Sequence, residues 1–379
     1  MRKLNVKLAY RAKIIDFLLK NTLSPFIKDK LPKDVNDVSP KNILILDFHL
    51  IGDMVMLTPL LINIRQMYPT SVIGLVAGPW ADAVLLNHPN LINFHFPIVS
   101  PWVKNISLFE GLINIFKCLI SIRRHKWDLG IEVRGDLRQI VFMSFCRIKY
   151  LLGYDFTGGS WLLDFVVPDD GAEKHIIEHH YQIIKFLGSK IHLSSFLPRL
   201  WLSDAETISI SSSDRYIGIH LGATHDLRRL PDLKALELIK TVLKYYPNRV
   251  VLFDAPDIVN LHNIFNLLDP AEKKLVSFYS GSLRDFIIML SKCDLFIGMD
   301  SGGGHIAAAL NVPTISIFGP SIPRLTSPVG KNIYYLESSD LELRCRPCNG
   351  NICISTIYKQ CFQTINFKVI NEILNNHSY

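Results

Sequence analysis

NILILDFHLIGDMVMLTPLLINIRQMYP, residues 42–69, decides the fold class. Its continuous apolar run from Ile43 to Leu46 is typical of a strand that is buried on both faces of a parallel sheet. A glycine-containing turn follows, and from Met54 the apolar residues recur with helical spacing until Pro69, where a helix must stop. The stretch therefore predicts a strand, a loop and a helix.

The same alternation of strand and helix recurs along the rest of the chain. Up to residue 188 it predicts two more strands and an amphipathic helix, over 71–79, 128–136 and 173–188. After a serine-containing stretch with little periodicity, strands and helices alternate again. Strands are predicted over 216–222, 249–256, 294–300 and 313–320, and helices over 233–247, 282–293 and 302–311. This alternation predicts an α/β protein with doubly wound parallel sheets.

The length of 379 residues exceeds what one hydrophobic core usually holds. We therefore expect two Rossmann-like domains with a cleft between them, over residues 41–206 and 214–379, after an N-terminal extension over 1–40. Ligands of open parallel sheets bind at the carboxyl ends of the strands, so the loops that follow strands are the candidate sites.

The net charge of +7 comes from the N-terminal extension. Residues 1–33 hold nine Lys/Arg against Asp16 and Asp29, and the remainder of the chain holds 32 basic and 32 acidic residues. A basic amphipathic helix suits the surface of an anionic membrane, and it also suits packing on the body of the protein. No signal peptide or 18-residue apolar run is present, so we expect a cytoplasmic protein, with contact to the inner face of the inner membrane left open.

The seven cysteines do not form the framework of a secreted protein. Three are dispersed in apolar segments, and four cluster in CRPCNGNICISTIYKQC as Cys345, Cys348, Cys353 and Cys361. Four thiols can bind zinc, but this spacing is not the paired spacing of a zinc ribbon. We expect a reduced structural cluster, ahead of the alternatives of a bound metal or a local disulfide, and no other cofactor.

Asp53 stands in the loop after the first strand, next to Gly52. A carboxylate at a helix start is often only a cap for free amides. At the mouth of a cleft it can instead act as a general base that deprotonates an acceptor hydroxyl. Asp47 and His49 lie nearby without the further acids that a metal site would need.

HLGATHDLRRLP, residues 220–231, follows another predicted strand. Gly222 lies in the turn, and Arg228 and Arg229 form a basic pair behind it. Arginine suits bidentate contact with phosphate, so this pair is either a phosphate contact or a solvated surface pair.

GMDSGGGHIA, residues 298–307, offers helix-start amides that carry no side chains, which favours binding of a phosphate or diphosphate. Gly302, Gly304 and Ala307 match the form G-x-G-x-x-A, but the next strand ends in IFGPSIPR without the acid that binds the ribose of a dinucleotide. The residues around Ser301 do not match G-x-S-x-G, which argues against a serine hydrolase.

Three of these stretches, in order, resemble glycosyltransferase family 9, the ADP-heptose:lipopolysaccharide heptosyltransferases. They are residues 43–69, IGIHLGATHDLRRLP and LFIGMDSGGGHIAAALNVPTISIFGP; the cysteine cluster over 345–361 also looks like a segment of many members. The resemblance implies a GT-B fold and inverting, metal-independent transfer of heptose or a related sugar from a nucleotide-sugar to a lipopolysaccharide-type or other surface-glycan acceptor.

The resemblance also implies residue roles. Asp53 is expected to be the catalytic base of an N-terminal domain that binds the acceptor. The diphosphate and ribose of the donor are expected to contact Arg228, Asp300, Ser301, Gly302, Gly303, Gly304 and His305. Gly52 and Gly222 are expected to support the loops, and no nucleic acid is expected as a partner.

Two positions depart from the family pattern. In the second loop, members commonly have Lys, one residue, Trp and Pro, and this chain has Arg228, Arg229, Leu230 and Pro231 instead. After the next strand, members tend to have a Glu that contacts the nucleoside, and this chain offers Asp257 or Asp254. These departures keep a second hypothesis open, a catalytically inactive nucleotide-sugar-binding protein of the same fold. An NAD-dependent oxidoreductase is disfavoured by the missing ribose acid.

Overall fold

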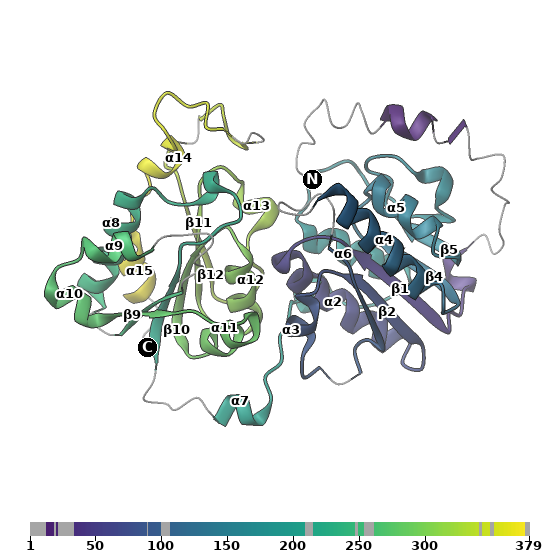
Figure 1. Cartoon of the computed structure of the whole chain (residues 1–379), viewed down its shortest axis with the longest axis horizontal. Helices are drawn as coiled ribbons and strands as arrows, with labels where there is room; N and C mark the ends of the chain where they lie inside the picture. The colour runs from purple at the N-terminus through teal and green to yellow at the C-terminus, as the bar shows by residue number, and fades with distance from the viewer. Residues whose placement is uncertain are drawn as a thin grey trace. The chain divides into compact units, whose positions relative to one another are not determined.

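A computed structural model describes residues 13–18, 20–21, 34–88, 90–99, 107–208, 215–246, 249–253, 261–340, 343–348 and 352–375. The chain divides into two compact units, Met1–Leu197 and Pro198–Tyr379 (Figure 1). The division lies at residues 197–198, a few residues before the expected boundary at 206–214. Most of the extension over 1–40, and Asp254 and Asp257, lie outside the described residues.

The first unit is built on one six-stranded parallel sheet in the order β3-β2-β1-β4-β5-β6. Its strands are β1 (Asn42–Asp47), β2 (Val72–Ala77), β3 (Phe94–Pro97), β4 (Trp127–Glu132), β5 (Ile148–Gly153) and β6 (Phe165–Val166). Its helices are α2 (Ile51–Met67), α3 (Ala81–Leu85), α4 (Leu108–Ile122), α5 (Leu137–Ser144) and α6 (Ile176–Phe186).

The second unit has its own six-stranded parallel sheet, in the order β12-β11-β10-β7-β8-β9. Its strands are β7 (Tyr216–His220), β8 (Val250–Phe253), β9 (Val276–Tyr279), β10 (Cys293–Met299), β11 (Thr314–Phe318) and β12 (Ile333–Glu337). Its helices are α7 (Asp204–Ile208), α8 (Asp232–Tyr245), α9 (Leu261–Asn266), α10 (Pro270–Leu275), α11 (Leu283–Leu290), α12 (Gly302–Ala309), α13 (Pro323–Thr326), α14 (Gln360–Gln363) and α15 (Val369–Asn375).

Both sheets therefore have the same strand order. In each, the first and fourth strands lie side by side at the centre, β1 beside β4 and β7 beside β10. These are the points where the winding of a doubly wound sheet reverses, and ligands of such sheets bind at the carboxyl ends of these strands. The predicted Asp53 loop follows β1, and the predicted glycine stack follows β10.

The apolar strand residues of the two sheets are buried, as the sequence predicts. Ile43 to Leu46 of β1 have no exposed surface. A glycine is needed at position 74 of β2, because an added Cβ would lie 2.5 Å from the Trp127 ring of β4. Among the described helices, none combines the length and the hydropathy needed to cross a bilayer.

Candidate active site

Asp53 lies in the first turn of α2, which begins at Ile51, three residues before the predicted start. Its Oδ2 accepts the backbone N–H of Leu50 at 3.2 Å, so the residue does cap the helix. Its Oδ1 also lies 3.1 Å from Nη1 of Arg134, and 27% of the side chain is exposed. Capping therefore leaves the carboxylate within reach of a ligand.

Arg134 was missed in the sequence analysis. It follows β4, and because β4 pairs with β1, it meets Asp53 across the centre of the sheet. Burial lowers the pKa of Arg134, but the carboxylates of Asp53 and Asp47 raise it by a larger amount. The net shift is upward, so the guanidinium keeps its charge. A basic residue directly after a buried strand is the only sequence signal that could have indicated it.

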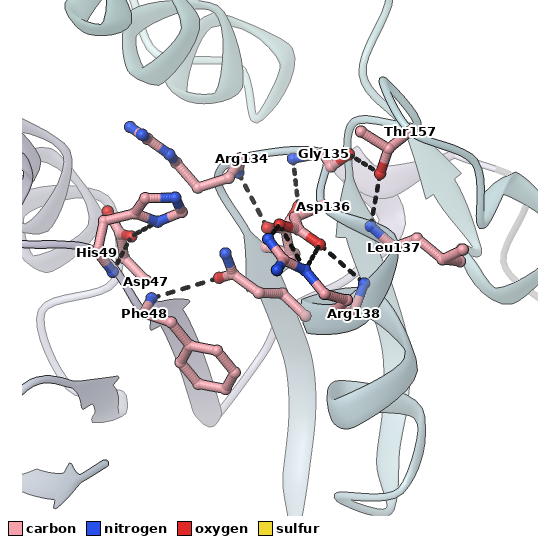
Figure 2. A network of polar contacts seen from close by, with 11 residues as sticks. Asp47, Phe48, His49, Arg134, Gly135, Asp136, Leu137, Arg138 and Thr157 are labelled. Carbon is pink, nitrogen blue, oxygen red and sulfur yellow. Dashed lines mark hydrogen bonds and ion pairs between the residues drawn. The ribbon is translucent and has the colours of Figure 1, made fainter. Parts of the chain in front are cut away.

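A buried carboxylate, Asp47, lies at the end of β1 beside this pair. Its Oδ1 accepts the backbone N–H of His49 at 3.0 Å and the ring Nδ1–H of His49 at 2.7 Å (Figure 2). Burial raises the pKa of Asp47, but the charges of His49 and Arg134 outweigh this effect and hold it well below its usual range. Asp47 therefore remains an anion that positions His49.

Glu132, the last residue of β4, is fully buried and fixes the loop that carries Arg134. Its two carboxyl oxygens accept the backbone N–H groups of Arg134 at 3.0 Å and Gly135 at 2.6 Å. Burial raises the pKa of Glu132 to about 8, although these two hydrogen bonds oppose the shift. Figure 2 shows the same loop continuing to the ion pair of Asp136 with Arg138.

In the second unit, two of the predicted donor-binding residues contact one another. Asp300 follows β10 and is buried, and its Oδ2 lies 3.3 Å from Nη1 of Arg228. Ser321, after β11, donates its hydroxyl to the same Oδ2 at 2.5 Å. Arg228 is therefore ion-paired with a buried carboxylate and is not a solvated surface residue. Ser321, which the sequence analysis missed, contacts the same carboxylate.

Ser301 and the glycine stack form the start of α12. Ser301 is the N-cap in extended backbone, and its buried Oγ has no hydrogen-bond partner among the described residues. An added Cβ at Gly303 would lie 3.1 Å from Phe296 Cζ, and one at Gly304 would lie 2.9 Å from Ser316 Oγ. The Cα positions of Gly303 and Gly304 therefore face the core, and what these residues can offer a ligand is the first-turn amides.

This packing predicts a measurable coupling between Gly304 and Ser316. Gly304→Ala should lower the free energy of unfolding by about 1–3 kcal/mol, because the new methyl group overlaps the Ser316 hydroxyl. Ser316→Ala alone should have little effect, since this buried hydroxyl has no partner among the described residues, and the double variant should regain part of the loss. Urea unfolding of the four proteins tests the coupling, and strictly additive effects would contradict it.

The loop between β7 and α8 is held by short contacts. An added Cβ at Gly222 would lie 2.7 Å from His220 Nε2, so a larger residue in this turn would have to displace the His220 ring. Arg229 donates from Nε to the carbonyl of Ala223 at 2.9 Å, and Leu230 packs into the core of this unit. The position that departs from the Trp of the family is therefore a core position here.

The remaining predicted site residues lie in the two helix starts and in the cysteine segment. Gly52 lies in the first turn of α2 and His305 in α12. Cys345, Cys348, Cys353 and Cys361 are free thiols that line one small cavity. Within the described part of the chain, no group of three or more His, Cys, Asp or Glu side chains is arranged to hold a metal ion.

Comparison with known proteins shows the family of this chain. The family model described as glycosyltransferase family 9 (heptosyltransferase) matches residues 115–358. The chain belongs to glycosyltransferase family 9. Membership of this family makes the protein a glycosyltransferase.

Individual relatives agree with the family. Lipopolysaccharide heptosyltransferases 3 and 2 of Escherichia coli (strain K12) are each 25% identical, over 300 and 297 residues that cover 74% of this chain and 83% of theirs. The solved structure of E. coli ADP-heptose lps heptosyltransferase II matches with a TM-score of 0.66 at 23% identity, covering 88% of this chain and 98% of that one. An E. coli heptosyltransferase solved with ADP matches with a TM-score of 0.65 at 17% identity, covering 89% and 100%. The fold of this family 9 chain is GT-B.

Proposed function

We propose that this chain transfers a heptose or a related sugar from a nucleotide-sugar, with inversion and without a metal ion, to a lipopolysaccharide-type or other surface-glycan acceptor. The observation that carries the proposal is the placement of two clusters at equivalent points of two sheets. Asp53 and Arg134 follow the central strands β1 and β4, and Arg228 and Asp300 follow the central strands β7 and β10. The named activities of the relatives support heptose as the sugar.

In this proposal the first unit binds the acceptor and Asp53 is the general base. Its partly exposed carboxylate takes the proton of the acceptor hydroxyl as that oxygen attacks the anomeric carbon. Arg134 compensates the charge of Asp53 and fixes its orientation. The buried Glu132 accepts the backbone N–H of Arg134, so the end of β4 holds in place the arginine that orients the base.

The second unit binds the donor. The first-turn amides of α12 and the guanidinium of Arg228 stabilise the diphosphate that leaves when the sugar is transferred. Asp300 holds Arg228 in position and is itself held by Ser321. The buried Ser301 hydroxyl and His305 complete the contacts to the donor, and Asp257 stays a predicted nucleoside contact outside the described residues.

A thermal-shift screen against nucleotide-sugars and nucleoside diphosphates tests the donor class. We expect ADP-heptose and ADP to raise the melting temperature, because a ligand that binds only the folded state stabilises it. UDP-sugars at the same concentration are the control. A shift by UDP-sugars alone would contradict ADP-heptose as donor, and binding of ADP-heptose without transfer to glycolipid would instead identify an inactive binding protein.

Contact with the inner face of the cytoplasmic membrane is part of the same proposal. The acceptor class is a membrane glycolipid, and the basic extension over residues 1–40 is suited to an anionic surface. Of this extension, the described residues include one helical stretch in which Ile14, Ile15, Phe17 and Leu18 are exposed.

A further inference from the structure

Helix α4 of the first unit has two apolar faces, of which only one is packed. Cys118 and Ile122 are buried in the core cluster that contains Phe96 and Trp127, and Ile115 and Leu119 pack against the same cluster. The opposite face carries the large apolar side chains Phe109, Leu112, Ile113, Phe116 and Ile120. Phe109 is 73% exposed, Leu112 63% and Phe116 64%.

The spacing of these five residues makes them one continuous stripe. Positions 109, 112, 113, 116 and 120 recur every three or four residues, which places them on the same side of a helix. From Phe109 to Ile120 the stripe spans twelve residues and is about 16 Å long. Single exposed apolar residues are ordinary, but an exposed apolar stripe of this kind marks an interaction surface.

Basic side chains lie at the edge and at the C-terminal end of this stripe. Lys117, Arg123, Arg124 and Lys126 are all exposed. Arg147 and Lys149 are exposed as well, and they lie beside the same end because Ile148 of β5 pairs with Trp127 of β4.

Among the residues that the structure describes, no matching set of acids accompanies these cations. The only acid of α4 is Glu110, whose carboxylate is bound to Ser107 at the start of the helix. Asp128, the next acid along the chain, accepts the backbone N–H groups of Lys41 and Asn42. An apolar stripe edged by Lys and Arg that form no ion pair within the described part of the chain is complementary to a bilayer that has anionic headgroups over an apolar interior.

We propose that α4 is a membrane-docking helix, which lies along an anionic bilayer and inserts Phe109, Leu112 and Phe116 below the headgroups. Lys117, Arg123, Arg124 and Lys126 bind the lipid phosphates. This assignment goes beyond the membrane contact proposed above for residues 1–40, since it places a docking surface on α4 of the first unit and requires neither donor nor acceptor.

Flotation of the full chain with vesicles tests the assignment. Wild type should bind vesicles of phosphatidylglycerol and phosphatidylethanolamine and should bind phosphatidylcholine vesicles much more weakly. Phe109→Gln/Phe116→Gln should bind the anionic vesicles about 10- to 100-fold more weakly, because two large apolar side chains no longer enter the bilayer. Arg124→Gln/Lys126→Gln should reduce the preference for anionic vesicles.

Leu233→Gln/Leu267→Gln is the matched control, because both leucines are more than half exposed and lie in the second unit. It should bind vesicles as wild type does. All variants should keep the melting temperature of wild type, since exposed positions contribute little to stability. Wild-type binding by the α4 double variant would overturn the proposal, as would a wild-type dimer that the same variant converts to a monomer.

Discussion

Asp53→Asn should lower the rate of sugar transfer by about 10²- to 10⁴-fold, the usual contribution of a general base. The amide oxygen of Asn can still accept the N–H of Leu50, so the start of α2 should remain intact. What is lost is the ability to take a proton from the acceptor hydroxyl. The measurement is the initial rate of transfer at saturating donor, with the donor dissociation constant measured in parallel.

Asp82→Asn is the control for this variant. Asp82 is also an acid in the first turn of a helix of the first unit, α3, but it is 74% exposed and pairs with His95. It should transfer sugar at the wild-type rate. A folded Asp53→Asn protein that binds donor and turns over at close to the wild-type rate would remove Asp53 as the base.

Arg228→Ala should weaken binding of a nucleoside diphosphate by about 10- to 100-fold, because hydrogen bonds to charged groups contribute about 1.5–3 kcal/mol. The loss has two physical sources. The guanidinium no longer contacts the diphosphate, and the buried Asp300 is left without its ion pair close to an anionic ligand. Titration calorimetry with ADP measures the effect, and Arg228→Lys should regain part of the affinity.

Arg215→Ala is the matched control for Arg228. Arg215 precedes β7 and pairs with Asp294 at 3.1 Å, at the opposite end of the strands from Arg228. Its removal should leave ADP affinity unchanged. An Arg228→Ala protein with wild-type ADP affinity would contradict the assignment of the diphosphate to this loop.

The central strands of both sheets could be predicted from the sequence, and the outer ones could not. β1, β7 and β10 are continuous apolar runs because they are buried on both faces. The short outer strands β3, β9 and β12 mix exposed and buried residues and leave no such run. Their place in the sheet depends on pairing with neighbours, which local sequence does not specify.

The residues of the candidate site likewise include some that the sequence predicts and some that it does not. A single strand end followed by an acid or a glycine stack can be recognised locally, as at Asp53 and Gly302. The partners Arg134 and Ser321 come from other strands, and only the strand order brings them to Asp53 and Asp300. The inward direction of Gly303 and Gly304 depends on how α12 is rotated against the sheet, which the run of glycines itself leaves open.

The most direct test of the central claim is transfer from ADP-heptose to a lipopolysaccharide core acceptor that lacks its terminal heptose. We expect ADP release that requires the acceptor, and an acceptor whose mass increases by one heptosyl residue. EDTA should not abolish the reaction, and Asp53→Asn should. Absence of transfer by a protein that binds ADP-heptose, with acceptors that known heptosyltransferases use, would contradict the account.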